Sequence, residues 1–441
     1  MDETPRILIV GGGYVGMYAA LRLQRKLRPG EASITVVDPR STMTYQPFLA
    51  EAAGGSIEPR HVVVPLRKVL RRCRVVTGRV TTVDIGRRVA SVLSAEGDRV
   101  DLPYDILVLA AGSLSRTLPI PGLAEHAIGF TTVAEAIHLR NHVLSRLDLA
   151  SSVDDPDRRR AALTFAAVGA GYSGVEVLAE LEDLARYALR FHPELSAADL
   201  RWVLVEASDR ILPEVSLPLA HYTAERLRRR GIEVRLNTRL ESVVDGHVRL
   251  SDGDGFDAET VVWTAGVRAN PLAARIGLPV DSRGRLICTA ELQVYGVPAV
   301  WSAGDAAAVP DLSVADLDAI CGPSAQHAVR QAKLLADNLV ASLRGRRLRP
   351  YRHAYAGSVA SLGLHKGVAE VYGIKLRGWP AWMMHRLYHL SRMPTLNRKA
   401  RVAMDWVLSW LFRREVVALE QLEHPRRDWE YATGPGFRDA A

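Results

Sequence analysis

The chain has 441 residues, of which 48% are hydrophobic and 24% charged. A chain of this length and composition is expected to fold into two or three globular domains with sizeable cores. No run of 18 apolar residues occurs, which excludes a membrane-spanning helix. The formal net charge of +8 is compatible with an anionic partner, such as a membrane surface or nucleic acid, and equally with an Arg-rich genome composition.

Three cysteines, Cys73, Cys288 and Cys321, are scattered along the chain without a CxxC pair. This spacing excludes a cysteine-bound metal cluster and a vicinal redox dithiol, and it is typical of a protein of the reducing cytosol. The acidic N-terminus runs directly into an apolar segment, so we expect no secretory signal.

Residues 6–38 have the pattern of a strand, a helix and a second strand. After the first apolar run, Gly11, Gly13 and Gly16 stand in GxGxxG spacing, and the second apolar run ends at Asp38. This is the fingerprint of a dinucleotide-binding fold, in which the glycines let the backbone approach a pyrophosphate at a helix N-terminus. Asp38 is placed to bind a ribose diol.

The next segments continue this first domain. A connection rich in Pro and Gly leads to a basic segment, Val64–Arg74, for which we predict a helix. Residues 74–95 alternate as paired strands do. The apolar run Tyr104–Gly112 ends in small residues, which suits a central parallel strand that passes close to a bound cofactor.

A charged linker, Ser151–Arg160, precedes a second copy of the opening pattern. Gly169, Gly171 and Gly174 repeat the GxGxxG spacing between an apolar run and a predicted helix, and the following strand ends at Glu206. Two such fingerprints in one chain predict two bound dinucleotides.

Later segments again show strands that end in small residues. Residues 235–262 are predicted as strand hairpins, and a strand ending at Gly266 repeats the small-residue ending of the earlier one. In the stretch VWSAGD, Gly304 and Asp305 end a short strand, where a carboxylate can accept hydrogen bonds from ribityl or ribose hydroxyls. A helix is predicted for Pro323–Leu343, and its N-terminal dipole can stabilise an anionic group.

The C-terminal region is basic and rich in Trp. Nine Lys or Arg residues oppose two acids between Lys375 and Glu415, and Asn397–Arg414 is predicted as a helix with two different faces. The polar face carries Arg398, Arg401, Asp405, Ser409 and Arg413, and the apolar face carries Val402, Ala403, Trp406, Val407, Trp410 and Leu411. Such a helix is typical of a membrane interface, with a core-packed helix or a dimer contact as alternatives.

With these motifs in place, the chain resembles the type II NADH:quinone oxidoreductases, also called alternative NADH dehydrogenases. The resemblance covers essentially the whole chain and is carried by GAGYSGVE at 169–176, VWSAGD, PSAQHA at 323–328 and the basic Trp-rich C-terminus. It implies an α/β fold with two Rossmann-like dinucleotide-binding domains, the NADH domain being inserted into a discontinuous FAD domain, and a C-terminal membrane-associating region. The implied boundaries are 1–120 and 286–345 for the FAD domain, 121–285 for the NADH domain and 346–441 for the C-terminal region.

The resemblance also assigns ligands to single residues. FAD would be bound by Gly11, Gly13, Gly16, Asp38, Val80, Gly112, Gly304, Asp305 and Ala325. NADH would be bound by Gly169, Gly171, Gly174, Glu206 and Gly266. A carboxylate at Glu206 accepts from a ribose 2′-hydroxyl and repels a 2′-phosphate, so NADH is expected to be preferred over NADPH, although Arg210 lies nearby.

Two catalytic positions follow from the same resemblance. Glu176 would lie close to the nicotinamide and the flavin, or would only complement the dipole of its helix. Gln326 would belong to the quinone site, whose family motif AQxAxQQ reads AQHAVRQA here, with Arg330 in place of a Gln. Ala356 stands where the family often has a Lys. These two departures concern the electron acceptor.

The implied reaction is hydride transfer from NADH to FAD, followed by transfer of two electrons to a membrane quinone, menaquinone or ubiquinone, without proton pumping. The protein would be peripheral at the cytoplasmic face of the cell membrane and bind no nucleic acid, and a homodimer is left open. One alternative is a soluble NADH oxidoreductase that reduces ferredoxin, oxygen or a small molecule. Another is a flavin-holding sensor like apoptosis-inducing factor. A disulfide reductase is disfavoured because the connection after the first fingerprint carries no dithiol.

Overall fold

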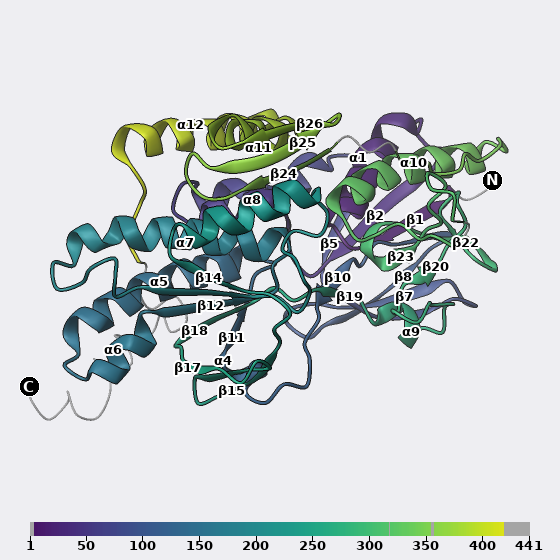
Figure 1. Ribbon diagram of the computed structural model, residues 1–441. Coiled ribbons are helices and arrows are strands. Elements are labelled where there is room, and N and C mark those ends of the chain that lie inside the picture. The colour runs from purple at the N-terminus through teal and green to yellow at the C-terminus, as the bar shows by residue number, and fades with distance from the viewer. Residues whose placement is uncertain (1–3, 317, 354–356, 419–441) are drawn as a thin grey trace, which may run out of the picture.

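The computed structural model describes residues 4–316, 318–353 and 357–418. Two parallel sheets with their helices lie side by side, and a C-terminal hairpin with two helices lies across them at the top of Figure 1. This arrangement confirms the predicted α/β fold class with two Rossmann-like units.

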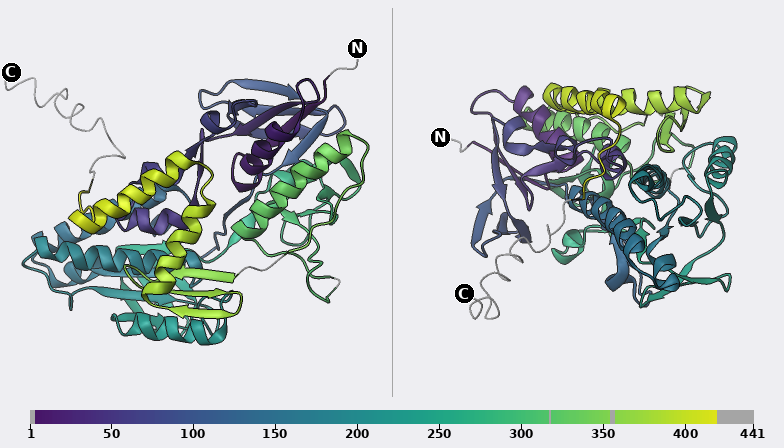
Figure 2. Two further views of the ribbon diagram at one scale, coloured as in Figure 1. Left: turned by 90° about the horizontal axis from the view of Figure 1, so that it is seen from above. Right: turned by 90° about the vertical axis from the view of Figure 1, so that its left-hand side faces the viewer.

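The first sheet carries the first glycine loop. Its strand order is β21 (Gln293–Val294), β22 (Val297–Ser302), β9 (Ile106–Leu109), β1 (Arg6–Val10), β2 (Ser33–Asp38) and β5 (Arg74–Thr77). The strands from β22 to β5 are parallel, and β21 pairs antiparallel with β22. Both faces of central β1 are buried from Ile7 to Val10, and this part of its sequence is continuously apolar. Helices α1 (Tyr14–Lys26) and α10 (Ala325–Leu343) pack against each other, as Figure 2 shows.

The second sheet carries the second glycine loop. Its strand order is β11 (Ala127–Gly129), β18 (Thr260–Trp263), β12 (Thr164–Val168), β13 (Arg201–Val205) and β14 (Ile232–Arg235), all parallel. On one face, Ala166 and Val203 pack against the hairpin strands β15 (Leu240–Val244), β16 (His247–Leu250) and β17 (Gly255–Asp257). On the other face, Phe165 and Trp202 join the core that contains α7 (Tyr172–Ala188).

A short ribbon links the two units. The chain leaves the first unit through β10 (Ser113–Ser115) and returns through β19 (Val267–Ala269), and these strands pair antiparallel. Because β21 and β22 rejoin the first sheet after this return, the second unit is inserted into a discontinuous first unit. The predicted domain boundaries at single residues stay predictions.

The helix predicted for Val64–Arg74 is wrong over most of its length. The structure has β4 (Val63–Pro65) and a helix of one turn, α3 (Leu66–Val69), before β5 begins. The β-branched residues at the start of this segment pair antiparallel with β3 (Thr42–Thr44), so tertiary pairing overrides the local helical pattern. The paired strands predicted within residues 74–95 are present as β6 (Arg79–Asp84) and β7 (Val89–Leu93), and β8 (Arg99–Pro103) pairs with β7 beyond the predicted range.

The C-terminal region forms a hairpin and two helices. Strands β24 (Gly357–Ser361), β25 (Gly367–Val371) and β26 (Ile374–Arg377) pack against α11 (Trp379–Arg392), and α12 (Leu396–Phe412) follows. Among the described helices, none is both long and apolar enough to cross a membrane.

Candidate nucleotide sites and a third cavity

The three glycines of the first loop have different structural roles. Gly11 has a φ of +106°, and a side chain there would overlap the carbonyl oxygen of Ala110 on the neighbouring strand. A side chain at Gly16 would overlap the carbonyl of Gly11, so this glycine lets α1 pack closely on the loop. At Gly13 a Cβ would meet no protein atom within 4 Å. The loop therefore opens at its middle glycine, where a dinucleotide-binding fold places the pyrophosphate.

The second glycine loop repeats this division. Gly169 has a φ of +102° and packs against Ala265 of the neighbouring strand end, and Gly174 packs against the carbonyl of Gly169. At Gly171 a Cβ again would meet no protein atom within 4 Å. Both loops thus leave the same kind of open cradle.

The two predicted acids are held in the same way. Asp38 accepts from the amide of Gly12, with 2.7 Å between nitrogen and Oδ2, and Glu206 accepts from the amide of Ala170 over 2.7 Å. In both cases the donor is the middle residue between the first two glycines of the loop. The carboxylates are thus fixed beside the open cradles, and their contact with a ribose stays a prediction.

The guanidinium of Arg210 does not face Glu206. Its Nη2 donates to the carbonyl of Pro213 over 2.7 Å, while Glu206 also accepts from the amide and hydroxyl of Ser208. The predicted effect of Arg210 on the preference for NADH stays a prediction.

A first cavity of about 170 Å³ opens beside the first loop. It gathers six of the predicted FAD-binding residues, namely Gly11, Gly13, Asp38, Gly112, Asp305 and Ala325. Gly304 lies at its edge, where its amide donates to Gln331 over 2.7 Å. Residues of the 42–46 segment also line the cavity, and no local sequence pattern singles them out. Val80 lies in β6 and Gly16 lies under the loop, so neither belongs to the cavity lining.

Asp305 is the buried carboxylate of this cavity. It accepts from the hydroxyl of Ser113 over 2.7 Å, and burial raises its pKa. Tyr14, which also lines the cavity, has a buried hydroxyl without a hydrogen-bond partner among the described residues. Buried polar atoms that lack a partner beside an open glycine loop fit a polar cofactor such as FAD.

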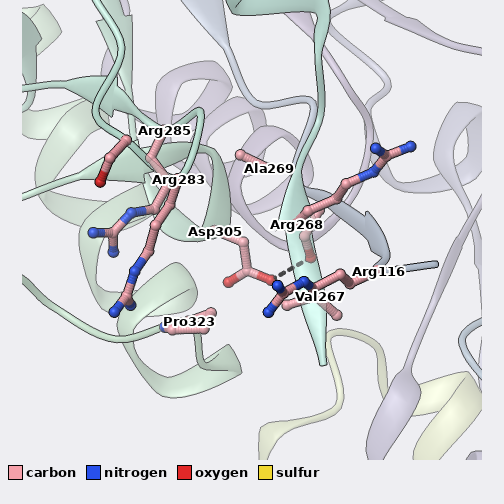
Figure 3. Close-up of a pocket in the computed structure, with 10 residues that line it drawn as sticks. Arg116, Val267, Arg268, Ala269, Arg283, Arg285, Asp305 and Pro323 are labelled. Atoms are coloured by element: carbon pink, nitrogen blue, oxygen red, sulfur yellow. Dashed lines mark hydrogen bonds between the residues drawn. The ribbon is translucent and has the colours of Figure 1, made fainter. Parts of the chain in front are cut away.

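A second cavity of about 590 Å³ begins at the same Asp305 and Ser113. Figure 3 shows Arg283 and Arg285 on one side of Asp305 and Arg116 and Arg268 on the other. Arg285 pairs with Asp281, whereas the structure contains no ion pair between the other three guanidinium groups and another described residue. The cavity therefore carries positive charge next to the predicted FAD site. These four arginines are spread over 170 positions of an Arg-rich chain, so no sequence motif indicates this cavity.

A third cavity, of about 210 Å³, adjoins the first through Tyr14 and Ala325. Its lining is aromatic and basic, and it consists of Tyr14, Tyr18, Tyr45, Pro47, Ala325, Gln326, Val329, Arg330, Lys333, Tyr388, His389, Ser391 and Arg392. The Nε2 of Gln326 donates to the carbonyl of Gly357 over 3.0 Å, and its Oε1 is buried without a partner among the described residues. Arg330 lines this cavity with its guanidinium 3.2 Å from Nδ1 of His353. Ala356 lies outside the described residues.

Glu176 is enclosed by the C-terminal region. Its Oε1 accepts from the amide of Ser361 over 2.9 Å and lies 3.2 Å from Nε2 of His385. Sequence reasoning placed Glu176 near the second loop but gave no indication of His385, because that contact joins residues more than 200 positions apart. Gly266 has a φ of +90° with open space at its Cβ, as Gly112 has in the first unit.

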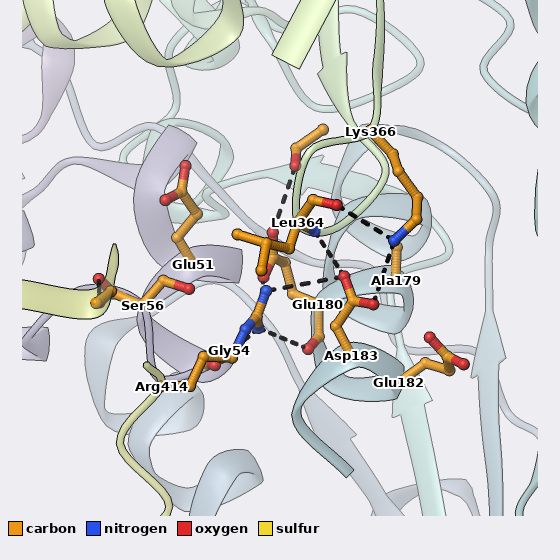
Figure 4. Close-up of polar contacts among 12 residues, drawn as sticks. Glu51, Gly54, Ser56, Ala179, Glu180, Glu182, Asp183, Leu364, Lys366 and Arg414 are labelled. Carbon is orange, nitrogen blue, oxygen red and sulfur yellow. Dashed lines mark hydrogen bonds and ion pairs between the residues drawn. The ribbon is translucent and has the colours of Figure 1, made fainter. Parts of the chain in front are cut away.

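A buried charge network fastens the C-terminal region to both units (Figure 4). Arg414 pairs with Glu180 of α7 over 2.8 Å and donates to the carbonyl of Gly54 over 2.9 Å. Asp183 accepts from the amide of Leu364 in the turn between β24 and β25 over 2.6 Å. The region is thus tied to α7, the helix that begins at the second glycine loop.

The predicted division of faces on the last helix is partly wrong. Asp405 and Ser409 of the predicted polar face point into the protein, where Asp405 lies 2.6 Å from Nδ1 of His61 and Ser409 donates to the carbonyl of Ser56 over 2.9 Å. Val402 and Trp406 of the predicted apolar face share this buried seam. The exposed side chains of α12 are mostly apolar, including Met404, Val407, Leu408, Trp410, Leu411 and Phe412. Arg413 lies beyond the last helical residue.

Comparison with known proteins agrees with this geometry. Residues 5–332 match the family described as pyridine nucleotide-disulphide oxidoreductase, and residues 355–415 match the family described as NDH2 C-terminal domain. The chain is 30% identical to the type II NADH:quinone oxidoreductase Ndh of Mycobacterium tuberculosis, over 93% of this chain and 89% of the relative. It is also 30% identical to the demethylphylloquinone reductase NdbB of Synechocystis sp., over 92% of this chain and 96% of the relative.

Solved structures share the fold over nearly the whole chain. The structure of NDH2 from Plasmodium falciparum in complex with NADH has a TM-score of 0.87 at 17% identity, and the match covers 94% of this chain and 100% of that one. The family matches extend through both nucleotide units and the C-terminal region. The chain therefore belongs to the pyridine nucleotide-disulphide oxidoreductase family and, within it, to the type II NADH:quinone oxidoreductases.

Proposed function

We infer that this protein is an FAD-dependent NADH dehydrogenase that takes hydride from NADH and passes two electrons to a quinone. The observation that carries this inference is the pair of equivalent glycine cradles, each with its anchored acid, together with the third cavity that adjoins the first. When bound, FAD supplies the chemistry that joins a hydride donor to a quinone, and the protein supplies binding, orientation and electrostatics.

We assign FAD to the first unit. The open cradle at Gly13 would receive the pyrophosphate, Asp38 would hold the adenosine ribose, and Asp305 would accept from ribityl hydroxyls. Val80 is proposed for the adenine end from family resemblance alone. Gly112 supports the assignment because its φ of +65° leaves the strand end open toward the cofactor.

We assign NADH to the second unit. The open cradle at Gly171 would receive the pyrophosphate, and Glu206 would accept from the 2′-hydroxyl of the adenosine ribose. The open position at Gly266 would let the dinucleotide pass toward the first unit. Glu176, five residues beyond Gly171, is proposed to act next to the nicotinamide.

The third cavity is our proposal for the quinone site. Four tyrosines give it flat apolar walls, and the unpartnered Oε1 of Gln326 supplies a polar group in its lining. Arg330 lines the same cavity, so the departure from the family motif adds a cation where the family has a neutral amide. The cavity thus suits a planar acceptor with polar oxygens.

A paired measurement tests this assignment. In Gln326→Leu, the rate at which NADH bleaches the bound flavin should stay unchanged, and kcat/KM for a short-chain menaquinone should fall about tenfold, the effect of one lost polar contact. Gln293→Leu, an amide that donates to the carbonyl of Pro298 on the first sheet, is the matched control and should change neither rate. Rapid bleaching without any quinone reduction in the wild type would direct the search to ferredoxin, oxygen or a small-molecule acceptor instead.

We further propose that α12 docks on a membrane surface, at the cytoplasmic face of the cell membrane. Trp410 and Phe412 are 77% and 76% exposed, and Arg401 and Arg413 lie exposed near them. Exposed aromatic and aliphatic side chains next to cations are the composition of a helix that lies in a lipid headgroup region. This placement would bring lipid-dissolved quinone to the third cavity, whose lining includes residues of the neighbouring α11.

Vesicle sedimentation tests the docking. The double change Trp410→Ser and Phe412→Ser should abolish binding to vesicles that contain anionic lipid, while NADH oxidation with a water-soluble quinone stays intact. Tyr295→Ser removes a similarly exposed aromatic ring from the turn between β21 and β22 and should leave vesicle binding unchanged. If instead the double change leaves vesicle binding intact and halves the molecular mass in solution, the exposed face of α12 is a homodimer interface.

A further inference from the structure

The stoichiometry of the proposed reaction requires one proton besides the hydride. NADH, one proton and a quinone yield NAD⁺ and a quinol, and the hydride carries two electrons and only one of the two protons. The other proton must reach the second quinone oxygen from elsewhere. This inference rests on the proposed quinone reduction and names the groups that supply that proton.

Three titratable groups form a line between the second glycine loop and the third cavity. Glu176 lies in the first turns of α7, and its Oε1 is 3.2 Å from Nε2 of His385 on α11. One helical turn further along α11, the ring of His389 has its centroid 4.6 Å from that of His385. His389 lines the third cavity, so the line ends where the acceptor is proposed to bind.

His385 is an unusual core residue. Its side chain is 1% exposed, and neither ring nitrogen makes a hydrogen bond to a described residue, although Nε2 lies 3.2 Å from Oε1 of Glu176. A histidine that served only to hold α11 on α7 would normally have both ring nitrogens satisfied. An unpartnered ring nitrogen beside a carboxylate is instead suited to take up and release a proton.

The electrostatic surroundings favour a proton on His385 and not on His389. Burial alone lowers the pKa of His385, and the charge of Arg386 acts in the same direction. The carboxylate of Glu176, with a smaller contribution from Glu51 of α2 (Leu49–Ala53), outweighs both effects and raises the pKa above its ordinary value of 6.5. Burial and the neighbouring His385 hold the pKa of His389 well below that value. His385 therefore holds a proton more readily than His389 does, so His385 suits the proton donor and His389 the neutral group that passes the proton on.

We propose that Glu176 and His385 hold the proton that completes the quinol and that His389 passes it into the third cavity. The O–H bond of the quinol forms as the proton leaves the pair, and water restores the proton to His385. His385 acts through His389 and touches neither nucleotide in this scheme.

An acceptor that takes electrons without protons separates this role from a structural one. In His385→Gln, quinone reduction should fall on the order of 10²-fold, the lower range for a positioned acid. We expect the wild-type rate to decline as pH rises above neutrality, and this decline should be absent in the variant. Ferricyanide takes electrons alone, so its reduction by NADH should proceed at the wild-type rate. His389→Gln should behave in the same way.

The matched control is His365→Asn. His365 lies exposed in the turn before β25, edge-on to Trp382, and Asn tolerates its φ of +63°. This variant should keep both rates and the pH profile. The proton role is overturned if His385→Gln reduces quinone with the wild-type rate and pH profile, or if it slows ferricyanide and quinone equally. A wild type that reduces ferricyanide but no quinone would overturn the proposed function itself.

Discussion

Removal of Arg414 should loosen the whole C-terminal region. This guanidinium follows α12 and lies against Glu180, with a distance of 2.8 Å and side-chain exposures of 6% and 1%. It also donates to the carbonyls of Gly54 and Glu180 over 2.9 and 3.2 Å. Arg414→Met keeps most of the apolar stem and leaves the Glu180 carboxylate buried without its partner.

The expected cost is about 3–5 kcal/mol, because loss of one member of a buried ion pair leaves the other charge uncompensated. Burial already raises the pKa of Glu180 against the opposing effect of Arg414, and in the variant this pKa rises further. A carboxyl whose pKa is higher in the folded than in the unfolded state destabilises the fold as pH rises through that interval. The cost should therefore be larger at pH 8 than at pH 5.

Hydrogen exchange of the α12 amides measures this cost. About 4 kcal/mol corresponds to roughly 10³-fold faster exchange in Arg414→Met, since about 1.4 kcal/mol is a factor of ten. Arg413→Met removes an exposed neighbour and should change exchange less than about threefold. Addition of Glu180→Gln to Arg414→Met should recover most of the protection. Equal exchange in the Arg413 and Arg414 variants would refute the reasoning.

Further predictions follow from the two nucleotide sites and from one half-buried histidine. Gly13→Ala should be purified without bound FAD, whereas Gly171→Ala should retain FAD and raise KM for NADH about tenfold. In both variants the new methyl group meets only the proposed ligand. The absorbance of the purified proteins and their steady-state kinetics test these expectations. Glu206→Gln should lower the ratio of kcat/KM for NADH over NADPH by about 10- to 100-fold, as expected for a lost charged hydrogen bond, and an unchanged ratio would remove Glu206 from the ribose site. Burial, with a smaller effect of His353, lowers the pKa of His327 to about 4, so its unfolded state binds the proton first as pH falls below 6.5. The stability difference between the wild type and His327→Gln, from urea midpoints, should therefore shift against the wild type between pH 6.5 and 4.

Local sequence patterns predicted the nucleotide units well. The GxGxxG loops and the acids Asp38 and Glu206 depend on backbone turns and strand ends that lie within some 40 residues, and the structure gives both copies the same geometry. The same reasoning identified Gly304 and Asp305, because a strand that ends in small residues and a carboxylate is itself a local pattern.

Contacts between distant segments could not be predicted in the same way. The seam of α12 holds Asp405 and Ser409 because polar groups of the 56–61 segment face them, and that segment is remote in sequence. The pairing of His385 with Glu176 likewise depends on how α11 packs against α7. Helical periodicity defines a face, but the partner decides which face is buried.

Anaerobic stopped-flow on the purified yellow protein tests the central claim most directly. The protein is reduced with NADH, and separately with NADPH, and is then mixed with a short-chain menaquinone in detergent. The account predicts rapid bleaching by NADH, much slower bleaching by NADPH, and rapid return of the oxidised flavin spectrum on addition of the quinone. Rapid bleaching by NADH followed by no faster reoxidation with quinone than with buffer alone would contradict it.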